Sequence, residues 1–186
     1  MPIPQNEHYT YSDYCTWDDS ERWELIEGVP YSMSPAPSPA HQAISVELSG
    51  QLRDFLKGKS CKVFRAPFDV RLNAAAEDDT VVQPDLAVIC DRSKIDDKGC
   101  QGAPDLIIEI LSPSTARHDR MVKFQQYQQA GVLEYWIVDP DTQTVQVCIL
   151  QDGLYFTHMY ADTDTAPVSV LPGCKINLPD VFAQDD

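Results

Sequence analysis

The chain has 186 residues, of which 43% are hydrophobic and 23% charged, as in globular proteins and unlike disordered or coiled-coil chains. Its 14 basic and 29 acidic residues give a net charge of −15. That charge excludes bulk electrostatic attraction to DNA or to an anionic membrane, so an anionic substrate would need a local basic patch or a metal ion. The length predicts a single domain over residues 1–186.

No apolar run approaches the length of a transmembrane helix, and the first residues show no basic segment followed by an apolar one. We therefore expect a cytoplasmic protein that does not enter a membrane. The six cysteines form no Cys-x-x-Cys pair, and several lie inside apolar runs. This pattern predicts reduced, mostly buried thiols rather than a zinc site or a redox pair.

The N-terminal half begins with a predicted β-hairpin, residues 22–26 and 29–33, around the turn Glu27-Gly28. A Pro/Ser-rich stretch then leads into a helix over residues 40–57, with Ser38 and Pro39 at its start and Gly58 at its end. Its apolar residues recur with helical spacing. Residues 61–72 alternate polar and apolar side chains, which predicts extended structure.

Further strands are predicted over residues 81–90, 105–111 and 134–138, with a helix over 115–130 that Gly131 ends. The run 105–111 is almost continuously apolar, as in a central strand covered on both faces. A second hairpin follows over 143–150 and 154–160, and short strands over 168–171 and 175–178. This order predicts an α/β (α+β) domain with a mixed central sheet flanked by helices, and with added N-terminal and C-terminal β-hairpins.

Three charged residues stand where packing favours apolar ones. Glu109 is the single charge in the strand 106–111, on the face of Ile107 and Leu111, and Asp85 shares a face with Ala87 and Ile89. Lys123 falls between the apolar positions of the following helix. Because an isolated buried charge costs several kcal/mol, charges on consecutive elements are expected to meet. They form either a structural ion-pair network or a catalytic site.

Two carboxylates and a lysine suit metal-assisted hydrolysis of a phosphodiester. Oxygen ligands at a sheet edge select Mg²⁺ or Mn²⁺, which retain water and bind substrate phosphate. A nearby lysine can orient metal-bound water or stabilise the charge of the transition state. A glycosidase also uses paired carboxylates, but it would not need Lys123.

A longer pattern runs through the same region. It comprises Gln83-Pro84-Asp85-Leu86, Gly102-Ala103-Pro104-Asp105-Leu106, the run from Glu109 to Thr115, Asp119, Lys123, Tyr127, Ala130-Gly131-Val132 and Glu134-Tyr135-Trp136, preceded by the run from Trp23 to Gly28, the run from Met33 to Pro37, and His41. Over roughly residues 9–150, the chain resembles the Uma-type restriction endonuclease family of the PD-(D/E)XK nuclease superfamily.

The resemblance implies a restriction-endonuclease-like core over about residues 40–150 and hydrolysis of DNA. It implies Asp85 and Glu109 as metal-binding acids, Glu47 on the first helix as a third acidic ligand, and Lys123 as the catalytic lysine. The superfamily usually places its lysine two residues after the second acid, where this chain has Leu111; in this family the lysine is thought to have moved to the following helix. A homodimer is implied as well.

Two features leave alternatives open. His41 lies near the start of the first helix and is either a hydrogen-bonded structural histidine or a neighbour of the active site. Residues 53–71 carry six basic and two acidic side chains, and Arg117 and Arg120 add positive charge, forming either a basic cleft or a solvated face. The alternative to a Mg²⁺-dependent nuclease is a non-catalytic nucleic-acid- or protein-binding module that retains the nuclease fold.

Overall fold

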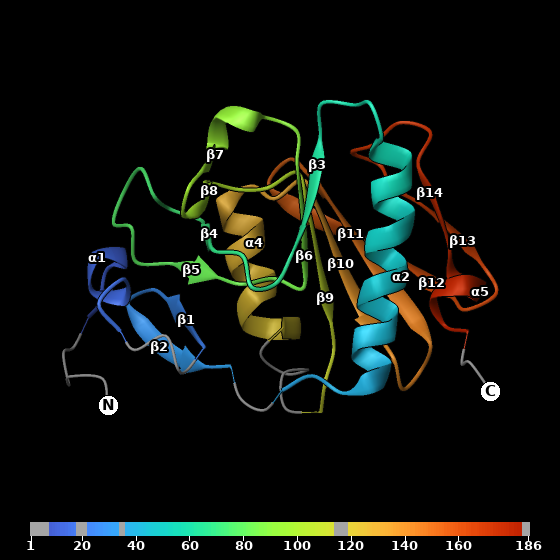
Figure 1. The fold of residues 1–186 in the computed structure, drawn as a ribbon, viewed down its shortest axis with the longest axis horizontal. Coiled ribbons are helices and arrows are strands. Elements are labelled where there is room, and N and C mark those ends of the chain that lie inside the picture. Colours follow the sequence, from blue (N-terminus) through green and yellow to red (C-terminus); the bar gives the residue numbers. More distant parts are fainter. Residues whose placement is uncertain (1–7, 18–21, 34–35, 114–118, 184–186) are drawn as a thin grey trace.

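The computed structural model describes residues 8–17, 22–33, 36–113 and 119–183 (Figure 1). The helices in these ranges are α1 (Tyr11–Tyr14), α2 (Pro39–Leu56), α4 (Phe124–Ala130) and α5 (Leu178–Val181), with a 3-10 turn η1 (Arg92–Lys94) and a π-helical turn η2 (Asp119–Lys123). The strands are β1 (Trp23–Ile26), β2 (Val29–Ser32), β3 (Lys62–Arg65), β4 (Val70–Arg71), β5 (Val81–Val82), β6 (Leu86–Ile89), β7 (Ile95–Asp96), β8 (Gly99–Gln101), β9 (Leu106–Ile110), β10 (Glu134–Asp139), β11 (Thr144–Gln151), β12 (Leu154–Ala161), β13 (Thr165–Pro167) and β14 (Lys175–Asn177).

A central sheet organises the fold. Within the described residues, its six strands run in the order β12-β11-β10-β9-β6-β3, and a second six-stranded sheet has the order β2-β1-β5-β4-β8-β7. The pair β9–β10 is parallel, whereas β6–β9 and β10–β11 are antiparallel. The predicted mixed sheet with flanking helices is therefore confirmed, but the N-terminal hairpin joins a second sheet of its own.

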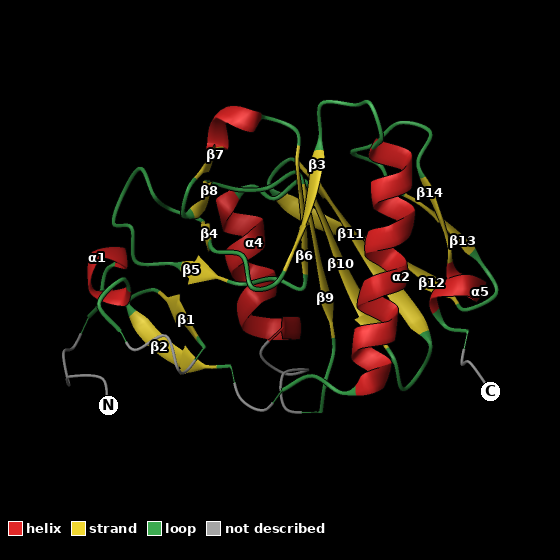
Figure 2. Cartoon of the chain, viewed as in Figure 1, coloured by secondary structure: helices red, strands yellow, loops and turns green. Residues whose placement is uncertain are grey.

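Helices α2 and α4 lie on opposite faces of the central sheet (Figure 2). Alternate residues of β9 supply the two cores: Leu106, Ile108 and Ile110 pack on the α2 side, and Ile107 on the α4 side. The α2 core also takes in buried residues from Ala166 to Phe182. The C-terminal segment beyond the predicted core of 40–150 therefore helps to cover one face of the sheet.

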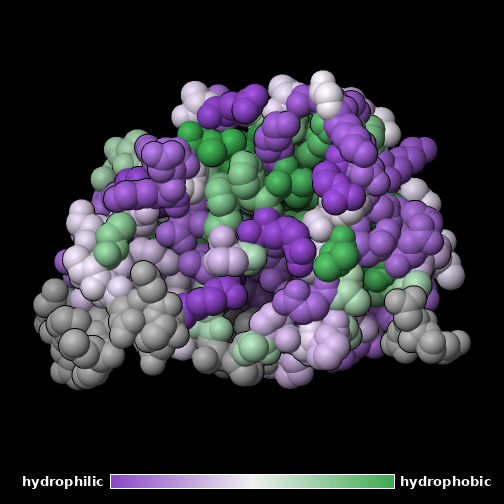
Figure 3. Space-filling model, in the orientation of Figure 1, coloured by the Kyte–Doolittle hydropathy of each residue, from purple (hydrophilic) through white to green (hydrophobic). Residues whose placement is uncertain are grey.

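Helix α2 follows its sequence signals closely. The Ser38 hydroxyl accepts a hydrogen bond from the His41 amide at 3.2 Å, and Pro39 occupies the first turn, where a missing N–H costs nothing. Leu48 and Leu52 of its apolar stripe are completely buried. The face of the molecule shown in Figure 3 is largely polar, with apolar residues gathered in its upper middle, over β3.

Two predicted strands are interrupted. Residues 81–90 form β5 and β6 with a break at 83–85, where Pro84 cannot donate to a strand ladder. Residues 61–72 form β3 and β4 with a break at 66–69, which contains the cis peptide Ala66-Pro67. The start of the predicted helix 115–130 lies outside the described residues, and its remainder is η2 followed by α4.

One expectation about the cysteines is wrong. Cys61 and Cys90 form a disulfide, whereas Cys15, Cys100, Cys148 and Cys174 are free thiols, the last three buried. The reason is the pairing of β3 with β6: Lys62 faces Ile89, so the same register places Cys61 opposite Cys90. Separately, a search of the described residues finds no helix that is long and apolar enough to cross a membrane.

Candidate active site

Asp85 and Glu109 lie side by side on adjacent antiparallel strands. Leu86 of β6 faces Ile108 of β9; Asp85 precedes Leu86 and Glu109 follows Ile108, so the two acids adjoin the last pair of this ladder. The Ile110 amide donates to Asp85 Oδ2 at 2.8 Å, which fixes the carboxylate against β9. Two acids separated by 24 positions in the chain therefore lie at the same end of two neighbouring strands in the interior of the sheet.

Lys123 meets Glu109 on the α4 side of the sheet. Its Nζ donates to Glu109 Oε1 at 3.0 Å, and the Tyr127 hydroxyl donates to the same oxygen at 2.7 Å. Lys123 and Tyr127 are one turn apart, so both side chains project from the same face of η2 and α4. The side chains of Lys123 and Glu109 are each 5% exposed. Of the predicted residues, the structure thus pairs Lys123 directly with Glu109 and places Asp85 next to Glu109, bound to the Ile110 amide.

Glu24 of the N-terminal hairpin belongs to the same cluster. Its Oε1 lies 2.9 Å from Lys123 Nζ and accepts a hydrogen bond from the Gln83 amide at 2.9 Å. Sequence reasoning noted Glu24 only as part of the family pattern. The available signal was the one that identified Glu109, because Glu24 also interrupts an apolar run, between Trp23 and Leu25.

Lys123 is surrounded by acids, and their charges set its protonation. Asp119 Oδ1 lies 3.4 Å from Nζ, in addition to Glu24 and Glu109. Burial by itself would lower the pKa of Lys123, but these carboxylates raise it well above its ordinary value. Burial raises the pKa of Glu109, against the effect of Lys123 and with a further contribution from Asp119 and Asp85. The cluster therefore holds one lysine that stays protonated and a larger number of carboxyl groups.

His41 connects helix α2 to the site. Its Nε2 lies 3.1 Å from Asp85 Oδ2, and its buried Nδ1 has no hydrogen-bond partner among the residues that the structure describes. Burial would lower the pKa of His41, but the hydrogen bond and charge of Asp85 outweigh burial and raise it. Of the two readings open from the sequence, the contact favours a neighbour of the site that orients Asp85.

Glu47 is not brought to this group. Its Oε1 accepts a hydrogen bond from Gln51 at 2.9 Å, and Gln51 in turn exchanges hydrogen bonds with the backbone of Asn177 in β14. Glu47 projects from α2, which packs on one face of the central sheet, whereas Glu109 faces α4 on the other. Helix α2 thus reaches the acids through His41.

Among the described residues, no group of three or more His, Cys, Asp or Glu side chains is arranged to hold a metal ion. The pair Asp85–Glu109 nevertheless offers hard oxygen donors, and the Asp85 side chain is 20% exposed. Mg²⁺ commonly binds through one or two carboxylates while retaining water. The residues present therefore fit a divalent cation held at the Asp85 side of the cluster.

Several of the basic residues predicted to line a cleft have partners. Arg71 pairs with Asp78, and Arg120 pairs with Asp139 at 2.9 Å. Arg53 and Lys57 are largely exposed at the end of α2. Arg117 lies outside the described residues.

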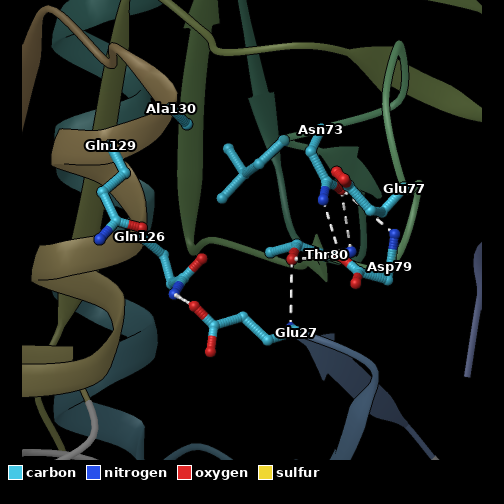
Figure 4. Close-up of a pocket in the computed structure, with 9 residues that line it drawn as sticks. Glu27, Asn73, Glu77, Asp79, Thr80, Gln126, Gln129 and Ala130 are labelled. Atoms are coloured by element: carbon cyan, nitrogen blue, oxygen red, sulfur yellow. Dashed lines mark hydrogen bonds between the residues drawn. The ribbon is translucent and has the colours of Figure 1, made fainter. Parts of the chain in front are cut away.

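A pocket of about 340 Å³ lies beside the site. The hairpin turn, the loop 73–80 and helix α4 line it with polar groups, and Gln126 donates to Glu27 across it at 2.8 Å (Figure 4). Asp85, Glu109 and Lys123 are not among its lining residues. Glu27 and Gln126 each follow a member of the cluster by three residues in the chain, but the side chains of the cluster do not line the pocket.

Comparison with known proteins gives a consistent assignment. The family model described as "Uma2: Putative restriction endonuclease" matches residues 10–179. Two uncharacterized proteins of Synechocystis sp. are similar: slr1290 is 30% identical over 134 residues (70% of this chain and 67% of that protein), and sll1609 is 28% identical over 144 residues (75% and 79%).

A solved structure shares the fold. It is a putative nuclease belonging to DUF820 from Anabaena variabilis, with a TM-score of 0.75 and 24% identity over 94% of this chain and 97% of that one. Its likeness extends through both large sheets, because so little of either chain is left uncovered. By the extent of the family match, this chain belongs to the Uma2 family of putative restriction endonucleases.

Proposed function

We propose that this protein is a metal-dependent endonuclease that hydrolyses phosphodiester bonds of DNA. The observation that carries the proposal is that Lys123 pairs with Glu109 while Asp85 binds the amide of the next residue, Ile110, in a chain of a nuclease-like family. Asp85 and Glu109 would hold Mg²⁺ or Mn²⁺. When bound, that ion would polarise the phosphate and lower the pKa of its water.

Each protein group has a role that follows from its contacts. Asp85 is the most accessible member, so a phosphate would approach from its side. Lys123 keeps Glu109 in place and supplies the positive charge that offsets charge developing on the phosphate. His41 and the Ile110 amide fix the orientation of Asp85, and Glu24 holds Lys123 from the opposite side.

The test is cleavage of plasmid and single-stranded DNA with Mg²⁺ or Mn²⁺, alongside calorimetric titration of the metal. Asp85→Asn and Glu109→Gln should lose metal affinity and cleavage together. Lys123→Met should retain metal affinity while cleavage falls by about 10²–10³. Asp54→Asn, an exposed carboxylate on α2, is the matched control and should cleave like the wild type.

Glu47→Gln separates two assignments of the third acid. The contacts described here predict normal cleavage for this variant, because Glu47 bonds Gln51 on the far side of the sheet. Loss of cleavage and metal binding in Glu47→Gln would instead restore Glu47 as a ligand. Folding of every variant is checked by thermal unfolding, since Glu109 and Lys123 are buried.

The second candidate is a non-catalytic binding module, favoured by the excess of acid over base. If purified wild type cleaves no DNA above the level of Asp85→Asn with either metal, yet binds DNA, this second candidate replaces the first. DNA binding through exposed basic residues should weaken steeply as salt is raised.

A further inference from the structure

Strand β12 is an open edge of the central sheet. Within the described part of the chain it pairs with β11 and with no other strand. Six of its eight residues are exposed, among them Leu154 at 61%, Phe156 at 52% and Met159 at 61%. At about 3.4 Å per residue, the strand presents roughly 27 Å of edge.

The other edges of the two large sheets carry devices that discourage pairing, and β12 does not. Edge strand β3 has charged residues at both ends, β2 contains Pro30, and β7 has only two residues. Charges, proline and short length are the usual means of protecting an edge. The segment 154–161 contains no Asp, Glu, Lys or Arg, although the chain as a whole has a net charge of −15. Two copies can therefore approach along β12 without charges opposing each other within the strand.

The free hydrogen-bonding groups of β12 can be identified from its hairpin. Gln151 faces Leu154 across the two-residue turn, so Leu154 and every second residue after it bond to β11. The residues between them point outward. Two of these outward amides are already occupied: Tyr155 donates to Gln128 Oε1 at 3.0 Å and Ala161 to Asp164 Oδ2 at 2.8 Å. Within the described ranges, the amides of Thr157 and Met159 have no partner and remain available to a second strand.

This arrangement is self-complementary about His158. An antiparallel copy of β12, related by a two-fold axis through His158, places Thr157 opposite the partner's Met159 and Met159 opposite the partner's Thr157. Each pair can exchange both backbone hydrogen bonds. The pairing therefore uses the amides of Thr157 and Met159, which Gln128 and Asp164 do not occupy. The same register sets Phe156 beside the partner's Tyr160 and covers exposed apolar surface. A two-fold axis requires such a self-matching patch.

We propose that β12 is a homodimer interface at which two copies pair antiparallel about His158 and join their central sheets. The interface does not involve Asp85, Glu109 or Lys123, because β10 and β11 separate β12 from β9. The proposal therefore stands or fails independently of the nuclease assignment. With little area beyond one strand, the dimer belongs to the weak class below about 1,200 Å² and should dissociate on dilution.

A cysteine placed at the axis tests the register. In a Cys15→Ser background, which removes the exposed thiol, His158→Cys should form a disulfide-linked dimer under mild oxidation. Facing residues of a non-hydrogen-bonded pair have Cα atoms about 4.5 Å apart, within the range of a disulfide. Phe156→Cys is the control: in this register the two copies of residue 156 lie about 14 Å apart, beyond that range. Equal crosslinking of both variants, or none of His158→Cys, overturns the proposal.

Sedimentation velocity over a range of protein concentrations tests the hydrogen bonds. Thr157→Pro removes an outward amide that β11 does not use, so the fold should survive while the dimer dissociation constant rises at least about tenfold. Val46→Lys alters an equally exposed apolar residue on α2, 54% exposed, and should not change association. A wild type that stays monomeric at the highest concentration, or a dimer that Thr157→Pro leaves intact, contradicts the interface. A wild-type monomer that captures only a foreign strand would assign the edge to a different partner and overturn the homodimer.

Discussion

Glu24 Oε1 and Lys123 Nζ lie 2.9 Å apart in a place that excludes water, with both side chains about 5% exposed. The contact joins the N-terminal hairpin to the helix that follows β9, across almost one hundred residues of chain. Lys123 also touches Glu109 at 3.0 Å. The hairpin is therefore part of the cluster, although it lies outside the predicted core of 40–150.

Lys123→Met should destabilise the fold strongly. The substitution removes the cation that Glu24, Glu109 and Asp119 share, and breaking a buried ion pair costs about 3–5 kcal/mol. Adding Glu24→Gln should recover part of this loss, because one uncompensated charge disappears. Urea unfolding of both single variants and of the double variant measures the coupling, expected within about 0.5–3 kcal/mol. If the losses in unfolding free energy of the two single variants add up to the loss of the double variant, Glu24 and Lys123 act independently.

Tyr127→Phe should lower the free energy of unfolding by about 1–3 kcal/mol, the cost of leaving a buried hydrogen-bond acceptor unsatisfied. The Tyr127 hydroxyl donates to buried Glu109 at 2.7 Å, and burial raises the pKa of Tyr127 so that it stays a donor. Tyr155→Phe is a matched comparison, because that hydroxyl donates to the neutral Val132 carbonyl at 2.8 Å. Chemical unfolding should rank Tyr127→Phe as the more costly change, and the reverse order would contradict a strong hydrogen bond between Tyr127 and the buried Glu109 carboxyl.

Because of Glu134, the free energy of unfolding should fall as pH rises. Burial raises the pKa of Glu134, against its hydrogen bonds from Trp136 and the Val170 amide. The folded state therefore holds this proton more tightly than the unfolded chain, whose carboxyl has a pKa of about 4.3. The stabilisation is complete below that pKa and is lost as pH rises through the folded value. Glu134→Gln should cost less at neutral than at acidic pH, as urea unfolding from pH 4 to 8 would measure; a pH-independent cost would argue against the raised pKa.

The Cys61–Cys90 disulfide should contribute about 2–4 kcal/mol, because it closes a loop with a sequence separation of 29. Cys61→Ser/Cys90→Ser should unfold at lower temperature than the wild type under non-reducing conditions, and at the same temperature once the wild type is reduced. Cys148→Ser removes a free thiol that closes no loop, so it serves as the control. In unfolded, unreduced wild type, thiol titration should find four reactive cysteines; six would show that the bond is not formed.

Local signals predicted much of the fold. Glu27-Gly28 and Asp152-Gly153 mark the two hairpins, and helix α2 begins and ends within one residue of its predicted bounds. The break before β6 could also have been predicted, because Pro84 lacks the amide that a central strand requires. Short strands such as β7 and β8 carry no comparable signal, since each has three residues or fewer.

The site was partly predictable for a different reason. Asp85, Glu109 and Lys123 each interrupt an apolar pattern, which was enough to suggest that they meet, although η1, β7 and β8 lie between β6 and β9 in the chain. Glu24 and the partner of Cys61 depend on distant pairings, of β1 with β5 and of β3 with β6. Such pairings follow from the topology of the whole sheet and not from any local pattern. The resemblance placed Glu47 at the site, yet the face on which α2 packs directs that side chain elsewhere.

The pairing of β6 with β9 also makes the cluster a check on correct folding. Side chains alternate between the two faces of a sheet, so a slip of one residue in β9 would turn Glu109 toward Leu48 and the rest of the α2 core. A misaligned chain could keep most of its secondary structure and still lack the acid pair. The DNA cleavage proposed above would then report the fraction of refolded molecules that are in register, a quantity that far-ultraviolet circular dichroism cannot distinguish.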